Sequence, residues 1–317
     1  SVRTNGASYF LNTSHDLPVM SLMSNPNNFW DPTNGILGDN IIWDPFGNKP
    51  RYPVYTEYFD TNGQFQFGIN GEMRRHGASS AFARHKPLKI SSKGTNIIPY
   101  PLFPNDKPDL DRYRLVILRN GGTQTDFYGP ELTDGLLAKV MKGADIDIMS
   151  FEPIVTYVNG QYYGMHYLRE RHDKYYYEYN LGWNPDSVDV VRRWLNWGWG
   201  WPPGGGVDSA EVIDGTDQRF NSLAAFMSTA DMTQVTDYEY FKEEVEWKNM
   251  IIYYGANYIV GNTDWPYNNF KMAHPGTDRG KWRFCFYDVE LCCENQNNVT
   301  LQFLVDPAGG PDQWVSE

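Results

Sequence analysis

One short segment combines acidic, amide and aromatic residues and reads Asn262-Thr-Asp264-Trp-Pro-Tyr-Asn268-Asn269. Two apolar runs follow it, residues 270–272 and 282–287, and they predict an antiparallel hairpin that ends in Asp288-Val-Glu290. In such a hairpin the start of the first strand lies beside the end of the second, about 5 Å away. Asn269 stands at that start and Asp288 at that end. We therefore expect their side chains to meet, with Asp264 in the loop just before them.

Three oxygen-bearing side chains at one sheet edge predict a site for a hard divalent cation. Mg²⁺ is typically held by one or two carboxylates, with waters and substrate phosphates as further ligands. Asp264 and Asn269 have the spacing of the Asp-x-x-x-x-Asn catalytic loop of protein kinases, in which the Asp handles the acceptor hydroxyl and the Asn holds a metal. Asp288 matches the later metal-binding aspartate by position, although no Phe-Gly follows it. The spacing alone leaves open that these residues are solvated turn formers.

A basic run in the first half of the chain predicts the partner of such a site. It reads Arg74-Arg75-His76-Gly77-Ala-Ser79-Ser80, followed by Arg84-His85-Lys86-Pro-Leu-Lys89. Gly77 and Ser79 favour a tight turn rich in backbone amides, which suits phosphate. Lys89 lies in a predicted strand whose neighbours Leu88 and Ile90 face the core, so its ammonium is expected on the opposite face. The alternative interpretation is a solvated basic surface.

A second hairpin is predicted around Asn159-Gly160, the dipeptide that suits a two-residue type I′ turn. Its second strand runs into Leu168-Arg169-Glu170. In a kinase-like layout the adenine-binding hinge follows such a strand, and Glu170 would then line the nucleotide pocket. By spacing alone, a surface salt-bridge partner is an equal alternative for Glu170.

The order of the predicted elements favours an α+β protein with two lobes. We expect an N-terminal extension of strands and loops over 1–65, a mostly β lobe over 66–170 and a mostly α lobe over 171–317. The predicted helices include residues 130–141, 173–179, a helix with apolar residues from Phe220 to Met227, and a long helix that begins at a Thr236–Glu239 capping box and stops at Gly261. The tryptophan-rich segment 194–206 is predicted to be a loop, packed on its own domain or exposed for binding sugar rings.

Composition excludes several classes of protein. The chain has 317 residues, 41% of them hydrophobic, which is ample for a large core and argues against a disordered chain. Its 27 Lys+Arg against 39 Asp+Glu give a net charge of −12, which disfavours nucleic-acid binding. No run approaches the roughly 18 apolar residues of a membrane span. The chain opens Ser1-Val2-Arg3 without a signal peptide, so the compartment stays open, as does the oligomeric state.

The residues of the first segment resemble the hallmark of the CotH spore-coat kinase family, Asn-x-Asp-Trp/His-x-x-Asn-Asn. Four other segments are similar to the family's pattern in the same order, so the resemblance covers nearly the whole chain. These segments are Leu17–Leu22 with Gly35-Ile36, Arg75–Ser80 with Lys86–Ile90, Val158–Glu170, and Tyr287–Glu290.

The resemblance implies a divergent protein-kinase-like fold and an atypical kinase that uses Mg-ATP, with Mn²⁺ as a possible substitute, to phosphorylate Ser or Thr of another protein. By carry-over, Asp264 is the catalytic-loop aspartate, and the metal ligands are Asp288 and Asn269, with Glu290 as a further candidate. Lys89, or else Lys86, neutralises the phosphates beside Arg75 and Ser79. The family also implies a spore-coat, secreted or cell-surface bacterial protein.

Several positions depart from the family's pattern and affect the phosphate side more than the metal side. Ala78, His85, Glu290 and the Cys292-Cys293 pair stand where Asn, Lys, Asp and Gly are usual. Two alternatives to kinase activity therefore remain. One is a weakly active or inactive kinase-like module that binds glycan or protein at a surface, and the other is transfer of AMP in place of phosphate.

Overall fold

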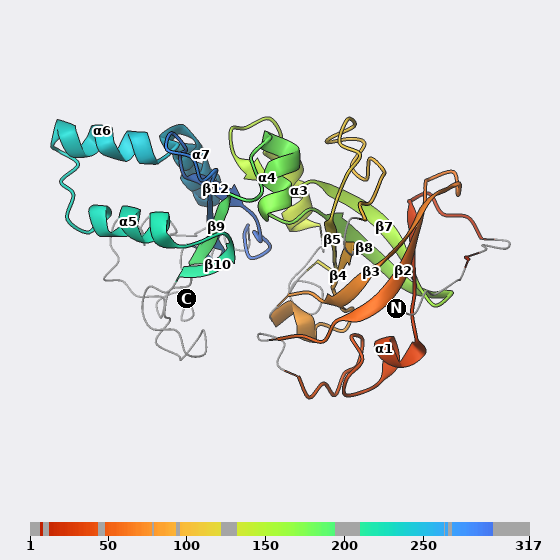
Figure 1. The fold of residues 1–317 in the computed structure, drawn as a ribbon. Coiled ribbons are helices and arrows are strands. Elements are labelled where there is room, and N and C mark those ends of the chain that lie inside the picture. Colours follow the sequence, from red (N-terminus) through yellow and green to blue (C-terminus); the bar gives the residue numbers. More distant parts are fainter. Residues whose placement is uncertain are drawn as a thin grey trace. The chain divides into compact units, whose positions relative to one another are not determined.

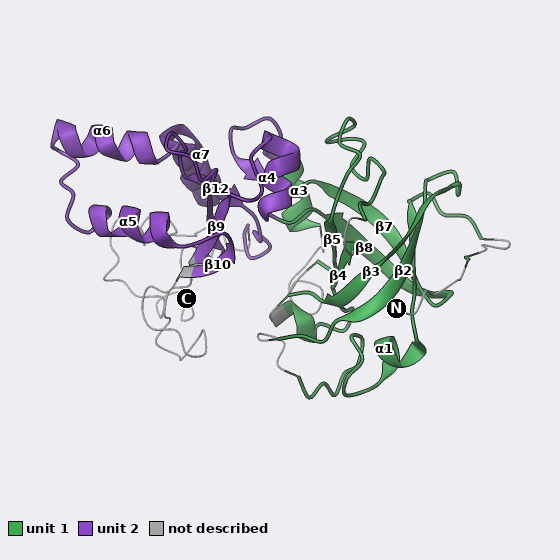
Figure 2. Cartoon of the chain, in the orientation of Figure 1, with its two compact units in different colours: residues 1–139, 149–171 green, residues 140–148, 172–317 purple. Residues whose placement is uncertain are grey.

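A computed structural model describes residues 7–8, 13–43, 48–77, 79–92, 96–121, 132–193, 210–262, 264–265 and 268–293. The chain forms two compact units, which Figure 2 shows in different colours. Unit 1 comprises residues 1–139 and 149–171, and unit 2 comprises residues 140–148 and 172–317. The tryptophan-rich loop predicted over 194–206 lies outside the described residues.

Unit 1 is built on a closed barrel of seven strands in the order β1-β2-β3-β4-β5-β8-β7 (Figure 1). Neighbouring strands are antiparallel, except that β1 pairs in parallel with β7 and closes the barrel. The segment 1–65, which we expected to be an extension, supplies β1 and β2 to this barrel. The strands are β1 (Val19–Met23), β2 (Tyr52–Phe59), β3 (Phe65–Arg75), β4 (Leu88–Ser92), β5 (Leu115–Arg119), β7 (Phe151–Val158) and β8 (Gln161–Arg169).

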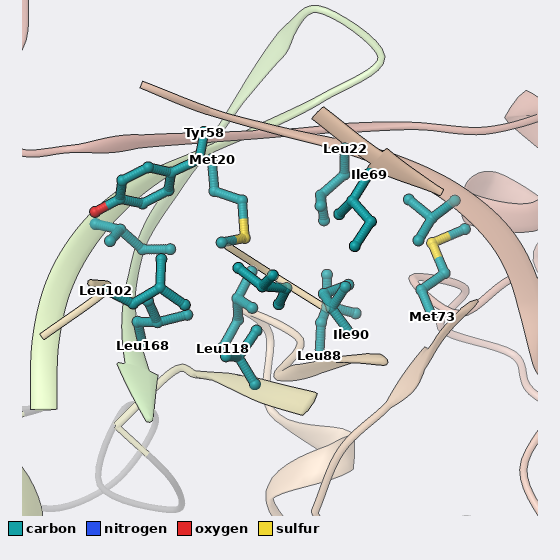
Figure 3. Packing of buried hydrophobic residues seen from close by; sticks show 14 of the residues in the cluster. Met20, Leu22, Tyr58, Ile69, Met73, Leu88, Ile90, Leu102, Leu118 and Leu168 are labelled. Carbon is teal, nitrogen blue, oxygen red and sulfur yellow. The ribbon is translucent and has the colours of Figure 1, made fainter. Parts of the chain in front are cut away.

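The barrel interior is a continuous apolar core, because alternate residues of each strand point inward. Figure 3 shows side chains from well-separated parts of the sequence meeting there, among them Met20, Ile69, Leu118 and Leu168. Leu88 and Ile90 also belong to this core, as their parity predicted. The side chain between them, Lys89, is therefore on the outer face of β4.

The predicted β7–β8 hairpin is confirmed. Asn159 and Gly160 both adopt positive φ, 48° and 80°, as a type I′ turn requires. Among the described residues of unit 1, the helical segments are α1 (Pro26–Trp30), the 3₁₀ turn η1 (Ser79–Phe82) and α3 (Thr133–Val140), the last within the helix predicted over 130–141.

Unit 2 contains a five-stranded sheet in the order β10-β9-β11-β12-β6, in which β6 is parallel to β12 and the other pairs are antiparallel. Its strands are β6 (Asp147–Ile148), β9 (Asp189–Arg193), β10 (Ala210–Asp214), β11 (Phe270–His274) and β12 (Arg283–Phe286). In the part of unit 2 that the structure describes, the helices are α4 (Lys174–Leu181), α5 (Gln218–Met227), α6 (Val235–Glu244) and α7 (Trp247–Ile259). This mixture of strands and helices agrees with the predicted α+β class, and the kinase-like character of the lobes stays a prediction.

The long helix predicted before Gly261 is wrong in two respects. Val245 has the extended backbone angles φ −122° and ψ 132°, so the chain forms two helices, α6 and α7. Val245 bridges to Trp282 instead, which explains the break, because a buried sheet-like contact replaces one helical turn. The capping box is wrong too: α6 begins after Gln234, so Thr236 lies inside the helix.

None of the helices in the described ranges combines the length and the apolar character needed to cross a bilayer.

Candidate active site

The loop that carries Asp264 is fixed to the end of α7 by a relay of side-chain amides. Asn257 donates from Nδ2 to the Tyr253 carbonyl (2.9 Å), and Asn262 donates from Nδ2 to Asn257 Oδ1 (2.8 Å). Asn262 Oδ1 then accepts the backbone N–H of Asp264 at 3.2 Å. Asn257 and Asn262 are almost fully buried, so these bonds are shielded from water. The relay holds the backbone of Asp264 in one position.

Trp265 pins the same loop to α7. Its indole Nε1 donates to the Tyr253 hydroxyl at 2.6 Å, and its ring packs edge-on against Tyr253, Tyr254 and Tyr258. Trp265 is 3% exposed. A large buried aromatic residue directly after Asp264 therefore anchors the loop.

The structure brings together three of the predicted residues, Asp264, Asn269 and Asp288. Asn269 Nδ2 donates both to Asp264 Oδ2 (2.9 Å) and to the backbone carbonyl of Asp288 (3.2 Å). Asn268, which the sequence reasoning did not select, donates from Nδ2 to the same Asp264 oxygen at 3.0 Å. One carboxylate is thus held by two consecutive amides, one of which also binds the chain at Asp288.

The backbone at two of these positions is unusual. Four non-glycine residues in the described part of the chain have positive φ, among them Asn269 (56°) and Asp288 (58°). Asn and Asp tolerate this left-handed region better than other residues, but it still costs free energy. Such positions cluster at functional sites, where the surrounding structure enforces them. Asn269 and Asp288, the two site residues in the left-handed region, are the donor and the acceptor of the same hydrogen bond.

The two carboxylates repel each other. Burial, and to a smaller extent the charge of Asp288, raise the pKa of Asp264 to about 7, although the hydrogen bonds from Asn268 and Asn269 oppose the rise. A carboxyl group with this pKa is a competent proton acceptor near neutral pH. A cation placed between the two carboxylates would relieve the repulsion.

The residues present fit a bound Mg²⁺. The Oδ1 atom of Asn268 is buried and accepts no hydrogen bond from the described residues, so an oxygen ligand is available beside the two carboxylates. Within the described ranges no three His, Cys, Asp or Glu side chains form a metal-binding cluster. Mg²⁺ takes few protein carboxylates and completes its shell with water and phosphate. Glu290 is buried near the end of this segment, and its predicted metal role stays a prediction.

The predicted phosphate-side residues lie in unit 1, and Arg75 has a structural explanation. Its Nε and two terminal nitrogens donate to the carbonyls of Ile36 (2.6 Å), Ala81 (3.1 Å) and Gly38 (2.6 Å). The guanidinium also stacks on Trp43, 5.0 Å from the ring centroid. Arg75 therefore ties three chain segments together at the barrel end, and its contact with phosphate stays a prediction.

The two candidate lysines differ in their surroundings. The Lys86 ammonium is 2.9 Å from the carboxylate of Asp39, with which it forms an ion pair. Lys89 is 6% exposed and stands directly across the β3–β4 ladder from Arg74. The roles of both as phosphate ligands stay predictions.

The outer face of β3, β4 and β5 gathers positive charge beyond what the sequence reasoning selected. Burial lowers the pKa of His76, and the charges of Arg119, Lys49, Lys89 and Arg171 lower it further. Arg119 lies on β5, next to the strand that carries Lys89. These cations could be grouped only from the register between the strands, which cannot be read from spacing along the sequence.

Glu170 is buried and accepts hydrogen bonds from the backbone N–H of Ser150 (2.9 Å) and from the ammonium of Lys107. It is therefore a buried ion-pair partner rather than a surface one, and its place in a nucleotide pocket stays a prediction. Ser79 begins η1 after Gly77, which has φ 78°, and its side chain lies outside the described part.

A cavity of about 510 Å³ in unit 2 lies at the opposite end of the β11–β12 hairpin from Asn269. Two of the cations that line it already have partners, since Arg283 pairs with Asp145 and Asp147 and Lys281 donates to the Lys242 carbonyl. It is separate from the site of Asp264 along both strands.

No curated protein matches the chain. A family model, described as CotH kinase protein, matches residues 73–315 and so covers most of the chain, including Arg75, Lys89, Asp264 and Asp288. The family suggests a kinase-like function, for which a nucleotide, a divalent metal and a protein substrate are the general requirements. The chain belongs to the CotH kinase protein family.

Proposed function

We propose that this protein is an Mg²⁺-dependent phosphotransferase that moves the γ-phosphoryl group of ATP to a Ser or Thr hydroxyl of a protein acceptor. The observation that carries the proposal is the hydrogen-bonded set of Asp264, Asn269 and Asp288, in which the Asn269 amide donates to the carboxylate of Asp264 and to the backbone carbonyl of Asp288. Family membership supports the reaction class.

Each residue has a task in this reaction. Asp264 orients the acceptor hydroxyl and accepts its proton, which its raised pKa favours near neutral pH. The hydroxyl oxygen forms a bond to the γ-phosphorus, the bond from that phosphorus to the β,γ-bridging oxygen breaks, and ADP leaves with the electron pair. Asp288, Asn269 and the Asn268 Oδ1 atom would hold Mg²⁺. When bound, the ion neutralises phosphate charge, which is the main catalytic effect in this class of reaction.

In unit 1, Lys89 is the proposed phosphate ligand, with Lys86 as the alternative. The collection of like charges around His76 supports an anionic ligand on the outer face of β3–β5. Four cations within electrostatic reach of one imidazole repel one another, and a phosphate group would offset that repulsion.

The test is transfer of labelled phosphate from ATP to a Ser-rich protein acceptor. Asp288→Ala should lower kcat by about 10²-fold or more, because a metal ligand supplies transition-state stabilisation. Asp278→Ala is the matched control, since Asp278 is an exposed carboxylate in the turn of the same hairpin, and it should leave kcat unchanged. Equal activity of the Asp288 variant and the wild type would refute the assignment, and an acceptor mass increase of AMP rather than phosphate would refute the reaction.

A further inference from the structure

Lys271 is a buried lysine that follows the Asp264 loop of the candidate site in the sequence. It belongs to none of the motifs described above. It follows Asn269 by two residues on β11, and the segment from Asp264 to Asn269 contains no lysine or arginine. Lys271 is 6% exposed, and among the described residues of unit 2 it is the one lysine or arginine in the buried set. Burial of an ammonium group is costly unless neighbouring groups compensate the charge.

The Lys271 side chain lies on the same face of the sheet as Tyr287. Its Nζ atom is 3.7 Å from the centroid of the Tyr287 ring, a close cation–π contact. Tyr287 directly precedes Asp288, and its hydroxyl is buried with no hydrogen-bond partner among the described residues. The ring is thus a fixed platform between the lysine and the strand end that carries Asp288.

The two carboxylates of the site are within electrostatic reach of this ring. Burial raises the pKa of the Tyr287 phenol and the charge of Arg192 lowers it, while the charges of Asp288 and Asp264 raise it further. Arg192 pairs with Lys271 across the β9–β11 ladder, but its guanidinium is bound to Glu211 at 3.1 and 2.5 Å. Lys271 is the buried cation that packs on the ring of the residue directly before Asp288.

We propose that Lys271 is a further catalytic residue, whose ammonium binds an oxygen of the γ-phosphoryl group while Tyr287 holds it in place. This inference rests on the proposed phosphotransfer. The transferred group carries negative charge on three oxygens, and a fixed cation that contacts one of them stabilises the transition state. The acidic residues cannot perform this task, because they repel phosphate unless a metal ion lies between.

The sign of the electrostatic effect distinguishes this role from a structural one. Because the positive charge of Lys271 opposes the binding of a cation, its removal should leave the affinity for Mn²⁺ alone unchanged or increase it. The same removal weakens the affinity for the polyphosphate. A residue that merely supported the fold of the loop would weaken both, because both ligands need the same geometry.

The experiment measures the dissociation constant of Mn²⁺ alone, by electron paramagnetic resonance, and that of MgATP, by calorimetry, on the full chain. For Lys271→Met we expect Mn²⁺ affinity equal to or above that of the wild type, MgATP affinity lower by about tenfold, and kcat lower by at least the same factor. Lys271→Arg keeps the charge and should restore MgATP affinity to within about threefold. Lys281→Met, the same substitution at the other end of the hairpin, is the control and should change neither constant.

Unchanged MgATP binding in Lys271→Met overturns the inference, and so does a parallel loss of Mn²⁺ and MgATP affinity. Retained Mn²⁺ binding also shows that the variant is folded, and Lys271→Arg offers a second test if it is not. A wild-type protein that binds Mn²⁺ but no MgATP contradicts the proposed function itself. Wild-type MgATP binding that is insensitive to Lys271 contradicts only the role of the lysine.

Discussion

Arg75 in unit 1 and Asp264 in unit 2 are both ionisable side chains withdrawn from water, and the fold treats them in opposite ways. Arg75 donates to three backbone carbonyls and stacks on an aromatic ring. Burial and the like charge of Asp288 together raise the pKa of Asp264 to about 7. The hydrogen bonds of Arg75 compensate the cost of burying its charge, and removing the side chain would leave their acceptors unsatisfied. A buried charge kept near a like charge costs stability, and this contrast separates a structural residue from a functional one.

Among the substitutions that test this contrast, Arg75→Met should change the free energy of unfolding most. The substitution leaves the carbonyls of Ile36, Gly38 and Ala81 without their donor, so we expect a loss of about 3 kcal/mol in the free energy of unfolding. Urea denaturation followed by tyrosine and tryptophan fluorescence measures the loss. Arg74→Met, one residue earlier on β3 and less buried, is the control and should lose less than half as much.

Activity of the same variant decides between the two roles of Arg75. With a structural role, the folded fraction of Arg75→Met keeps a near-normal KM for ATP. Unchanged stability together with a large increase in that KM would contradict the structural interpretation and assign Arg75 to the phosphate.

The parts of the site that could be predicted are local in sequence. Asn269 and Asp288 meet because a hairpin joins them, and the Asn159-Gly160 turn follows from the positive φ that only a few residues accept. The parts that could not be predicted depend on distant segments. The parallel pairing of β1 with β7 closes the barrel across more than a hundred residues, and two of the three carbonyl partners of Arg75 lie 37 and 39 residues away.

Two errors of the sequence analysis arose because patterns local in sequence do not show the contacts made in the folded chain. A capping box and an apolar stripe predicted one long helix, but the contact of Val245 with Trp282 overrides that local preference. Asn268 was passed over because the kinase-like spacing uses only its neighbour Asn269. Its importance appears only when the hydrogen bond to Asp264 and the partnerless Oδ1 atom are seen together.

Asp264→Asn tests the functional side of the contrast. Its effect on the free energy of unfolding should be smaller than that of Arg75→Met, and it should raise this free energy rather than lower it. The folded protein holds the Asp264 proton up to pH about 7, whereas the unfolded chain releases it near the ordinary value of 3.8. Between these values the folded state binds more protons, so the metal-free protein loses stability as pH rises through this window. Asp264→Asn abolishes that loss and should be more stable than the wild type by about 2 kcal/mol at pH 8.

The measurement is the urea midpoint of both proteins in EDTA at pH 4.5 and pH 8. The stability difference should be largest at pH 8 and should shrink at pH 4.5, where wild-type Asp264 is protonated. A stability difference that does not change with pH would show that the pKa of Asp264 is not raised in the folded protein. The asparagine keeps an oxygen for the Asn268 and Asn269 amides, so the variant isolates the charge.

Trp265→Phe gives the smallest expected effect and asks whether the loop needs its anchor. The phenylalanine keeps an aromatic ring but loses the 2.6 Å hydrogen bond to the Tyr253 hydroxyl, which leaves a buried hydroxyl without its donor. We expect a loss of about 1 kcal/mol in stability, whereas Trp247→Phe at the start of α7 should cost less. If Trp265 holds Asp264 in position, the variant misplaces the carboxylate that orients the acceptor hydroxyl. That interaction matters most in the transition state, so kcat should fall by more than KM rises. A fall in stability with unchanged kcat would make Trp265 a structural residue like Arg75, and the placement of Asp264 would then depend on the amide relay through Asn262 alone.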